Sequence, residues 1–120
     1  MIVVKTWESK GFVADKPFER VIKCLISPKL QDINNIGVGM VILPPGNKTT
    51  SHSHEKEEET WYVISGRGEI TVGDETVDIE PEMLVVAPSG KVHSIHNNSD
   101  ESLKMLWIFT PPGIEEEYIR

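Results

Sequence analysis

Four histidines lie in two short windows of this 120-residue chain, and imidazole is a common ligand of transition metals. His52 and His54 are two residues apart, so on an extended strand they project from the same face as a chelating pair. Three glutamates, residues 57–59, follow closely and offer a carboxylate. His93 comes after the tight turn at residues 88–90, which can begin another strand and aim its side chain. These groups predict a metal centre.

Three neutral imidazoles and one carboxylate would carry a single negative charge in all. A divalent metal held by them would keep about two of six octahedral positions open. The ligand types suit Mn, Fe, Co, Ni or Zn, and affinity alone does not choose among these metals. For one histidine, a polar surface position is the default interpretation. The spacing of the set and its flanking turns favour the metal site instead.

Strands must position these side chains. Turn residues punctuate the chain at short intervals and separate runs rich in Val, Ile and aromatic residues, a pattern typical of an all-β sandwich or barrel. We expect strands at residues 20–26, 36–43, 49–54, 59–65, 69–72, 75–79, 83–87, 93–96 and 103–110. The third of these would carry the His52 and His54 pair.

One hairpin has a predictable register. Gly73-Asp74 suits a two-residue turn, because glycine readily adopts a positive φ. Val72 would then oppose Glu75, and Ile70 would oppose Val77. The apolar, buried face of this hairpin would consist of Ile70, Val72, Val77 and Ile79.

Length and composition bound the remaining possibilities. The chain fits one domain over residues 1–120, with residues 1–19 as an N-terminal arm and strand. A net charge of −7 argues against a nucleic-acid partner. No apolar run reaches the ~18–20 residues of a membrane span, and the first ten residues lack a signal-peptide pattern. We therefore expect a cytoplasmic protein without a membrane partner. Cys24, the lone cysteine, is expected to be a buried and inert thiol.

Residues 46–97 resemble the two motifs of a small single-domain cupin. The first motif, Gly-x5-His-x-His-x3–4-Glu-x6-Gly, is matched by Gly46, His52, His54, Glu59 and Gly66. The second motif, Gly-x5-Pro-x-Gly-x2-His-x3-Asn, is matched by Pro88, Gly90, His93 and Asn97. Glu82 stands where the second motif has its leading glycine, which leaves the turn geometry there open. Two spaced motifs are a strong signal, whereas His-x-His alone is weak.

The resemblance implies a fold and a ligand set. The fold would be an antiparallel double-stranded β-helix, that is, a jelly-roll barrel. One divalent transition metal would be bound by His52, His54, Glu59 and His93. Glu58 is the alternative carboxylate, but only Glu59 keeps six residues before the closing glycine.

Several other residues have two interpretations. With Glu59 facing inward, Trp61 also faces inward, to line the pocket or to pack in the core, and Tyr62 faces outward. His96 falls on the opposite face from His93 and is expected to be a polar partner or a surface residue rather than a ligand. No general acid or base stands out, and the nearest candidates are Glu57 and Glu58, should their loop fold over the mouth.

The C-terminal part carries two further expectations. The run at residues 103–110 is apolar on both faces, because Leu106 and Ile108 lie on the face opposite the alternating residues from Leu103 to Phe109. Small cupins commonly dimerise through such surfaces, so we expect a homodimer. Residues 114–120 would be a helical turn or a frayed tail, with the glutamates at 115–117 forming a solvated face.

The function expected from this resemblance is a metal-dependent enzyme acting on a small oxygen-rich substrate. A dioxygenase, a sugar or hydroxy-acid isomerase, a decarboxylase or a cyclase would all suit an open metal site that polarises a carbonyl or a hydroxyl. The alternative is a non-catalytic module that binds a small carbohydrate or carboxylate. A third interpretation is a metal with a purely structural role that stabilises the barrel, which a closed site without a cavity would favour.

Overall fold

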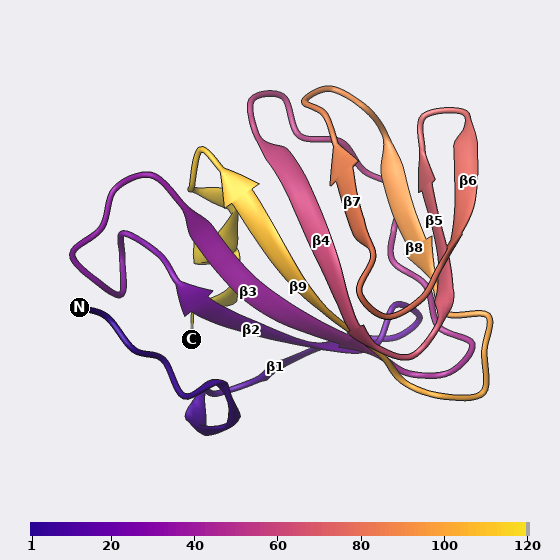
Figure 1. Ribbon diagram of the computed structural model, residues 1–120, viewed down its shortest axis with the longest axis horizontal. Coiled ribbons are helices and arrows are strands. Elements are labelled where there is room, and N and C mark those ends of the chain that lie inside the picture. The colour runs from indigo at the N-terminus through magenta and orange to yellow at the C-terminus, as the bar shows by residue number, and fades with distance from the viewer. Residues whose placement is uncertain (120) are drawn as a thin grey trace.

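The protein consists of two antiparallel β-sheets that enclose a core, as the computed structural model describes for residues 1–119 (Figure 1). The larger sheet has the strand order β1-β2-β3-β9-β4-β7, and the smaller has the order β6-β5-β8. Its strands are β1 (Phe12–Ala14), β2 (Arg20–Ile26), β3 (Gly37–Leu43), β4 (Glu58–Ser65), β5 (Gly68–Val72), β6 (Glu75–Ile79), β7 (Leu84–Ala87), β8 (His93–His96) and β9 (Leu103–Thr110). This architecture confirms the predicted jelly-roll barrel.

Most predicted strands occur where the sequence places them. Strands β2, β6, β8 and β9 have the expected bounds, and β3, β4, β5 and β7 differ by one residue at their first position. Within the N-terminal arm, β1 pairs with β2, preceded by the short 3-10 helix η1 (Thr6–Glu8). A second 3-10 helix, η2 (Ile114–Tyr118), follows β9. Among residues 1–119, no helix is long and apolar enough to cross a membrane.

The predicted strand at residues 49–54 is wrong as a regular strand. That segment runs antiparallel to β8, but only two isolated bridges join them, Lys48 with His96 and His52 with His93. Between the bridges the side-chain Oγ1 of Thr49 accepts a hydrogen bond from the Ile95 amide at 3.0 Å. The hydroxyl replaces a backbone carbonyl there, which interrupts the ladder and shifts the register by one residue. The segment still aims its histidines at β8.

The hairpin of β5 and β6 has the predicted register, with Val72 opposite Glu75 and Ile70 opposite Val77. Its predicted apolar face is only partly buried. Ile70 and Ile79 are buried, but Val77 is 45% exposed, which corrects the expectation for that residue. The reason is that β6 is an edge strand of the smaller sheet, so no neighbouring strand covers Val77 on its outer side.

Glu82 adopts a positive φ of 73° in the turn between β6 and β7. Its amide donates a hydrogen bond to the Val63 carbonyl at 2.9 Å, which ties the turn to β4. This is the conformation that glycine adopts most easily. The turn geometry associated with the missing motif glycine is therefore present, although glutamate occupies the position.

The core lies between the two sheets and is built by alternating residues. Every second side chain of β9 is buried, beginning with Leu103 and ending with Phe109, and the residues between them are partly buried. In β4 the same alternation buries Glu59, Trp61 and Val63 and leaves Tyr62 partly exposed, as predicted. Period-2 alternation thus directs one carboxylate into an otherwise apolar interior.

Candidate metal centre

Four side chains converge at one point on the inner wall of the barrel. Each of His52, His54, Glu59 and His93 offers a ligand atom, and these atoms all lie within 4.8 Å of one another. Glu59 and His93 are buried, with 6% and 3% of their surface exposed, and His52 and His54 are partly buried. The structure therefore brings together the complete set that the sequence predicts.

Three chain segments hold these residues in place. The amide of His52 donates to the His93 carbonyl at 3.1 Å, and the His93 amide donates back at 2.8 Å, which fixes the two backbones side by side. The Gly90 amide donates to the His54 carbonyl at 2.7 Å. Glu59 points inward from β4, whereas Glu58, the alternative carboxylate, is exposed. The placement of the two glutamates agrees with the choice of Glu59.

Backbone carbonyls orient two of the imidazoles. Nδ1 of His52 lies 2.9 Å from the Thr50 carbonyl oxygen, and Nδ1 of His93 lies 3.1 Å from that of Lys91. A carbonyl oxygen only accepts, so in each ring Nδ1 carries the hydrogen and Nε2 keeps a free lone pair. Histidines that bind a metal almost always donate their other ring N–H in this way.

The ligand atoms of His54, His93 and Glu59 that face the centre lie close together but make no hydrogen bonds with one another. Nε2 of His54 and Nε2 of His93 lie 3.3 and 3.2 Å from Oε1 of Glu59. Within residues 1–119, however, none of these three buried atoms has a partner with hydrogen-bond geometry. Buried polar atoms are rarely left unpaired, so three of them aimed at one point fit a bound cation.

Burial and mutual contact tune the protonation of the cluster. Burial lowers the pKa of His52, which favours the neutral, metal-binding imidazole. Burial alone would raise the pKa of Glu59, but hydrogen-bond-range contacts with His54 and His93 outweigh it, and the pKa is lowered. At neutral pH the centre therefore presents a carboxylate and at least one firmly neutral imidazole.

Acidification should release the metal from this centre. Protons compete with the metal for the imidazole nitrogens, and below the ordinary histidine pKa of about 6.5 that competition increases. Because burial lowers the pKa of His52, its imidazole stays neutral further into the acid range, so we expect the loss below that ordinary value rather than above it. Metal content after dialysis at stepped pH, with circular dichroism as a control for folding, measures this. Full retention at pH 4 would contradict histidine ligation.

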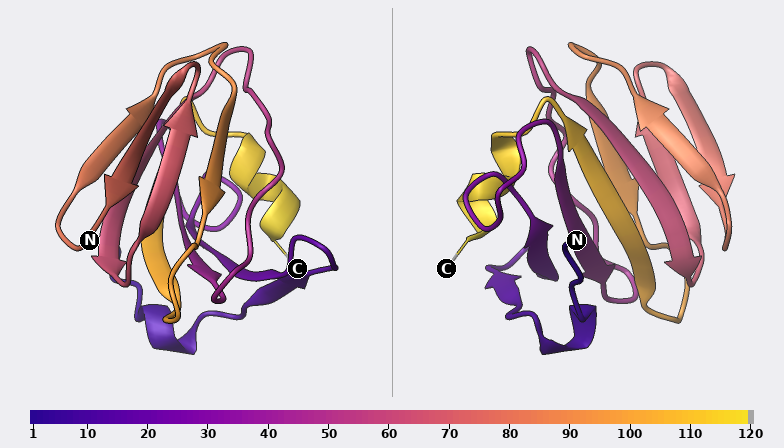
Figure 2. Two further views of the ribbon diagram at one scale, coloured as in Figure 1. Left: turned by 90° about the vertical axis from the view of Figure 1, so that its right-hand side faces the viewer. Right: turned by 60° about the vertical axis from the view of Figure 1, so that its left-hand side comes forward.

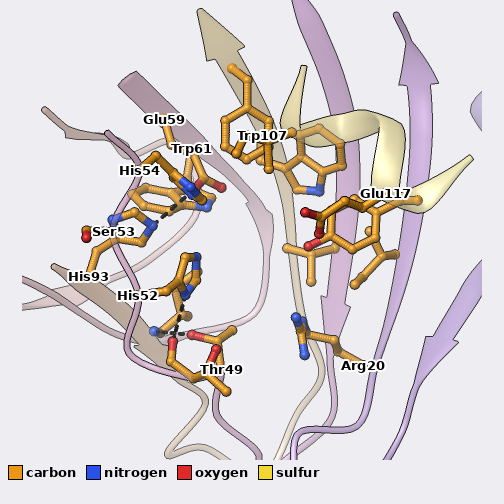
Figure 3. A pocket seen from close by; sticks show the side chains of 17 residues that line it. Arg20, Thr49, His52, Ser53, His54, Glu59, Trp61, His93, Trp107 and Glu117 are labelled. Atoms are coloured by element: carbon orange, nitrogen blue, oxygen red, sulfur yellow. Dashed lines mark hydrogen bonds and ion pairs between the residues drawn. The ribbon is translucent and has the colours of Figure 1, made fainter. Parts of the chain in front are cut away.

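The centre opens onto a cavity of about 410 Å³ inside the barrel (Figure 3). Aromatic side chains form much of its wall. The Trp61 ring meets His93 edge to face, with ring centroids 5.2 Å apart, and Phe109 meets His54 at the same distance. Trp61 is only 2% exposed, so it both packs in the core and lines the cavity, which unites its two predicted roles. A cavity beside the donors disfavours a purely structural metal.

The opposite wall carries polar side chains that sequence reasoning missed. Arg20, Glu117 and Tyr118 line the cavity, and Figure 3 shows the first two across from the histidines. They come from the first residue of β2 and from η2, outside both motifs, so no spacing signal could have found them. Glu57 and Glu58, the expected acid–base candidates, do not line this cavity, which corrects that expectation.

The predicted solvated face of residues 115–117 is wrong for its first member. Glu115 is fully buried, and its carboxylate accepts hydrogen bonds from the Ser27 hydroxyl at 2.6 Å and the Gly113 amide at 2.5 Å. A Cβ on Gly37 would overlap the Glu115 side chain, so the glycine makes room for it. Figure 2 shows η2, in yellow, lying beside β2 and β3. Glu115 anchors η2, and η2 in turn forms part of the cavity wall.

Two other predicted side chains lie outside the centre. His96 points away from His93, and its Nδ1 is 3.3 Å from Oε1 of Glu69, which confirms a polar partner. Cys24 is half-buried, and burial, aided by the nearby Glu115 and Glu116, raises its thiol pKa to about 11. The thiol stays protonated at neutral pH, as expected for an inert cysteine.

Known proteins share both the sequence pattern and the fold. The family model for the cupin domain matches residues 39–109. An uncharacterized protein of Streptomyces coelicolor is 38% identical over 78 residues, covering 65% of this chain and 72% of its own. Among solved structures, a predicted oxalate decarboxylase from Thermotoga maritima superposes with a TM-score of 0.84 at 24% identity, covering 92% of this chain and all of its own. The polyketide cyclase RemF from Streptomyces resistomycificus has a TM-score of 0.81 at 20% identity, over 93% of this chain and 80% of its own.

Proposed function

This chain belongs to the cupin family, and from that premise we propose that it is a mononuclear metal enzyme acting on a small oxygen-rich substrate. His52, His54, Glu59 and His93 would hold one divalent transition metal. The observation that supports this most directly is the convergence of four donors, three of their atoms buried without hydrogen-bond partners, beside a cavity large enough for a small molecule. The names of its structural neighbours describe different chemistries on one fold, so the fold leaves the reaction open.

The protein's own residues would contribute position and exclusion of water. When bound, the metal would supply Lewis-acid polarisation of a substrate carbonyl or hydroxyl. The rings of Trp61, Trp107 and Phe109 would shield the substrate, which strengthens polar contacts in the cavity. Tyr118 on the opposite wall is a proton donor within the same cavity, because burial raises its pKa and keeps the phenol protonated.

The alternative is a binding module that holds a carbohydrate or carboxylate without changing it. The two functions separate when protein loaded with Fe(II) or with Zn(II) is incubated with hydroxy acids and sugars while oxygen uptake and the NMR spectra of the ligands are followed. Turnover that disappears in the variant His93→Ala supports the enzyme. Tight binding with unchanged ligand over a day supports the module instead.

We also propose that the chain forms a homodimer through the outer face of its larger sheet. Cross-strand pairing aligns Leu106, Tyr62 and Leu84 in one row across β9, β4 and β7 on that face, and the row ends at Met40 on β3, which is already buried. On β7, Leu84 is 67% and Val86 51% exposed, although both are apolar. Exposed apolar residues gathered on one face are typical of an interface, and the same face on a second copy is self-complementary.

Charges on this face should therefore separate the dimer. We expect the double variant Leu84→Lys, Val86→Lys to sediment as a monomer at a concentration where the wild type is a dimer, because two lysines from each copy would be desolvated at the interface. The control is Val92→Lys, at an exposed valine next to the smaller sheet. A wild type that sediments as a monomer, or a double variant that remains dimeric, would refute the interface.

A further inference from the structure

The cavity wall that faces the metal ligands carries a cation. Arg20 begins β2, and its side chain lines the cavity together with that of Ile22 two residues later. Its Nη1 donates a hydrogen bond to the Phe18 carbonyl at 2.8 Å, which holds the guanidinium in place. A guanidinium has several further N–H donors in a planar fork, so most of its hydrogen-bonding capacity remains for another acceptor.

Arg20 has no carboxylate counter-ion in the described part of the chain. None of the ion pairs among residues 1–119 involves it. Glu117 lines the same cavity, but its side chain is exposed and makes no ion pair with Arg20. The only hydrogen-bond partners of Arg20 within residues 1–119 are uncharged, namely the Phe18 carbonyl and the Tyr118 hydroxyl. The hydration that this partly buried cation loses is therefore only partly compensated, and an anion entering the cavity would supply the missing counter-charge.

Tyr118 adds a neutral donor on the same wall. Burial is the largest influence on its phenol and raises the pKa, whereas the nearby Arg20 lowers it less. The hydroxyl therefore keeps its proton at neutral pH and can donate to an anion that sits against Arg20. The tyrosine ring is held by its neighbours Trp107 and Phe12, with centroids 5.9 and 6.4 Å away.

We propose that Arg20 and Tyr118 bind an anionic group of the substrate on the wall opposite the metal ligands. The substrate is then bifunctional: oxygen atoms at one end face His52, His54 and His93, and a carboxylate or phosphate at the other end meets Arg20. Figure 3 shows the two ends of the cavity that this arrangement connects. The metal-facing end of this inference rests on the proposed function, whereas the anion-binding end rests on Arg20 and its surroundings.

Three probes with a common 2-hydroxy-acid end test this: L-lactate, L-malate and 3-phosphoglycerate, which differ at the far end by a methyl, a carboxylate and a phosphate. In calorimetry on zinc-loaded protein we expect one of the two probes that carry a second anionic group to bind about 10- to 100-fold more tightly than lactate. Which of them does so separates carboxylate from phosphate recognition. Arg20→Met should abolish this preference, so that the affinity for the preferred probe falls far more than the affinity for lactate.

Lys23→Met is the matched control, because it removes the same charge from the same strand. The Lys23 Nζ donates to the Thr6 carbonyl outside the cavity, so the preference for a probe with a second anionic group should persist. Equal affinities of the wild type for all three probes would overturn the proposal. A loss of lactate and malate binding to the same extent in Arg20→Met would also overturn it, since that result indicates a structural role.

A second readout does not depend on metal. In metal-free protein, the NMR signal of the Arg20 Nε–H should shift on titration with malate or 3-phosphoglycerate and stay in place with glycerol, which carries no anionic group. Metal content measured on the same samples tests the proposed metal-dependent function independently of the anion site. A wild type that takes up no metal overturns that function, whereas an Arg20 signal indifferent to both anions overturns the anion site.

Discussion

Replacing His93 with alanine should empty the metal centre while the barrel stays folded. His93 supplies one of four donors, and its loss should weaken metal binding by more than the ~10–100-fold typical of losing a residue that only orients a ligand. We expect occupancy to fall from about one metal per chain to below about a tenth. Metal analysis after gel filtration, with circular dichroism to follow the fold, gives the answer.

The chain offers a matched control for this experiment. His96 is on the same strand, three residues further along, but faces Glu69 on the outside of the cluster. His96→Ala should keep its metal, and His93→Gln, which preserves volume better, should lose it. Full occupancy in His93→Ala, or an equal loss in His96→Ala, would remove His93 from the ligand set.

Replacing Glu115 with alanine should produce the largest loss of stability among single changes in η2. The substitution leaves the Ser27 hydroxyl and the Gly113 amide without their acceptor and opens a cavity beside Gly37. We expect the free energy of unfolding to fall by about 2–4 kcal/mol, as for other losses of buried hydrogen-bonded groups. Urea denaturation followed by tryptophan fluorescence measures it.

Two neighbouring variants sharpen this test. Glu116→Ala removes an exposed glutamate from the same helix and should change stability by less than about 0.5 kcal/mol. Glu115→Gln should fall between, because its amide can donate to Ser27 and its oxygen can accept from Gly113. If Glu115→Ala is as stable as Glu116→Ala, the carboxylate does not anchor η2.

The residues of the centre were predictable because strand geometry and motif spacing act locally. The period of β4 alone directs Glu59 inward and Glu58 outward. The register of β5 with β6 followed from a two-residue turn. In both cases the decisive interaction spans only a few residues, so it leaves a clear pattern in the sequence.

What the sequence left open depends on contacts between distant segments. The irregularity near Thr49 arises because its hydroxyl meets the Ile95 amide, 46 residues away. Glu115 is buried because Ser27 and Gly37 receive it, and both lie far along the chain. Arg20 reaches the cavity only through the packing of β2 into the larger sheet. An acidic run and a lone arginine carry no local mark of such placement.

The most direct test of the account is the metal content of the wild-type protein purified without added metal and then exposed in turn to Mn, Fe, Ni and Zn. Three buried donor atoms without hydrogen-bond partners predict tight uptake of about one divalent ion per chain. A protein that carries no metal and takes up none of these four would contradict the proposed centre and the function built on it.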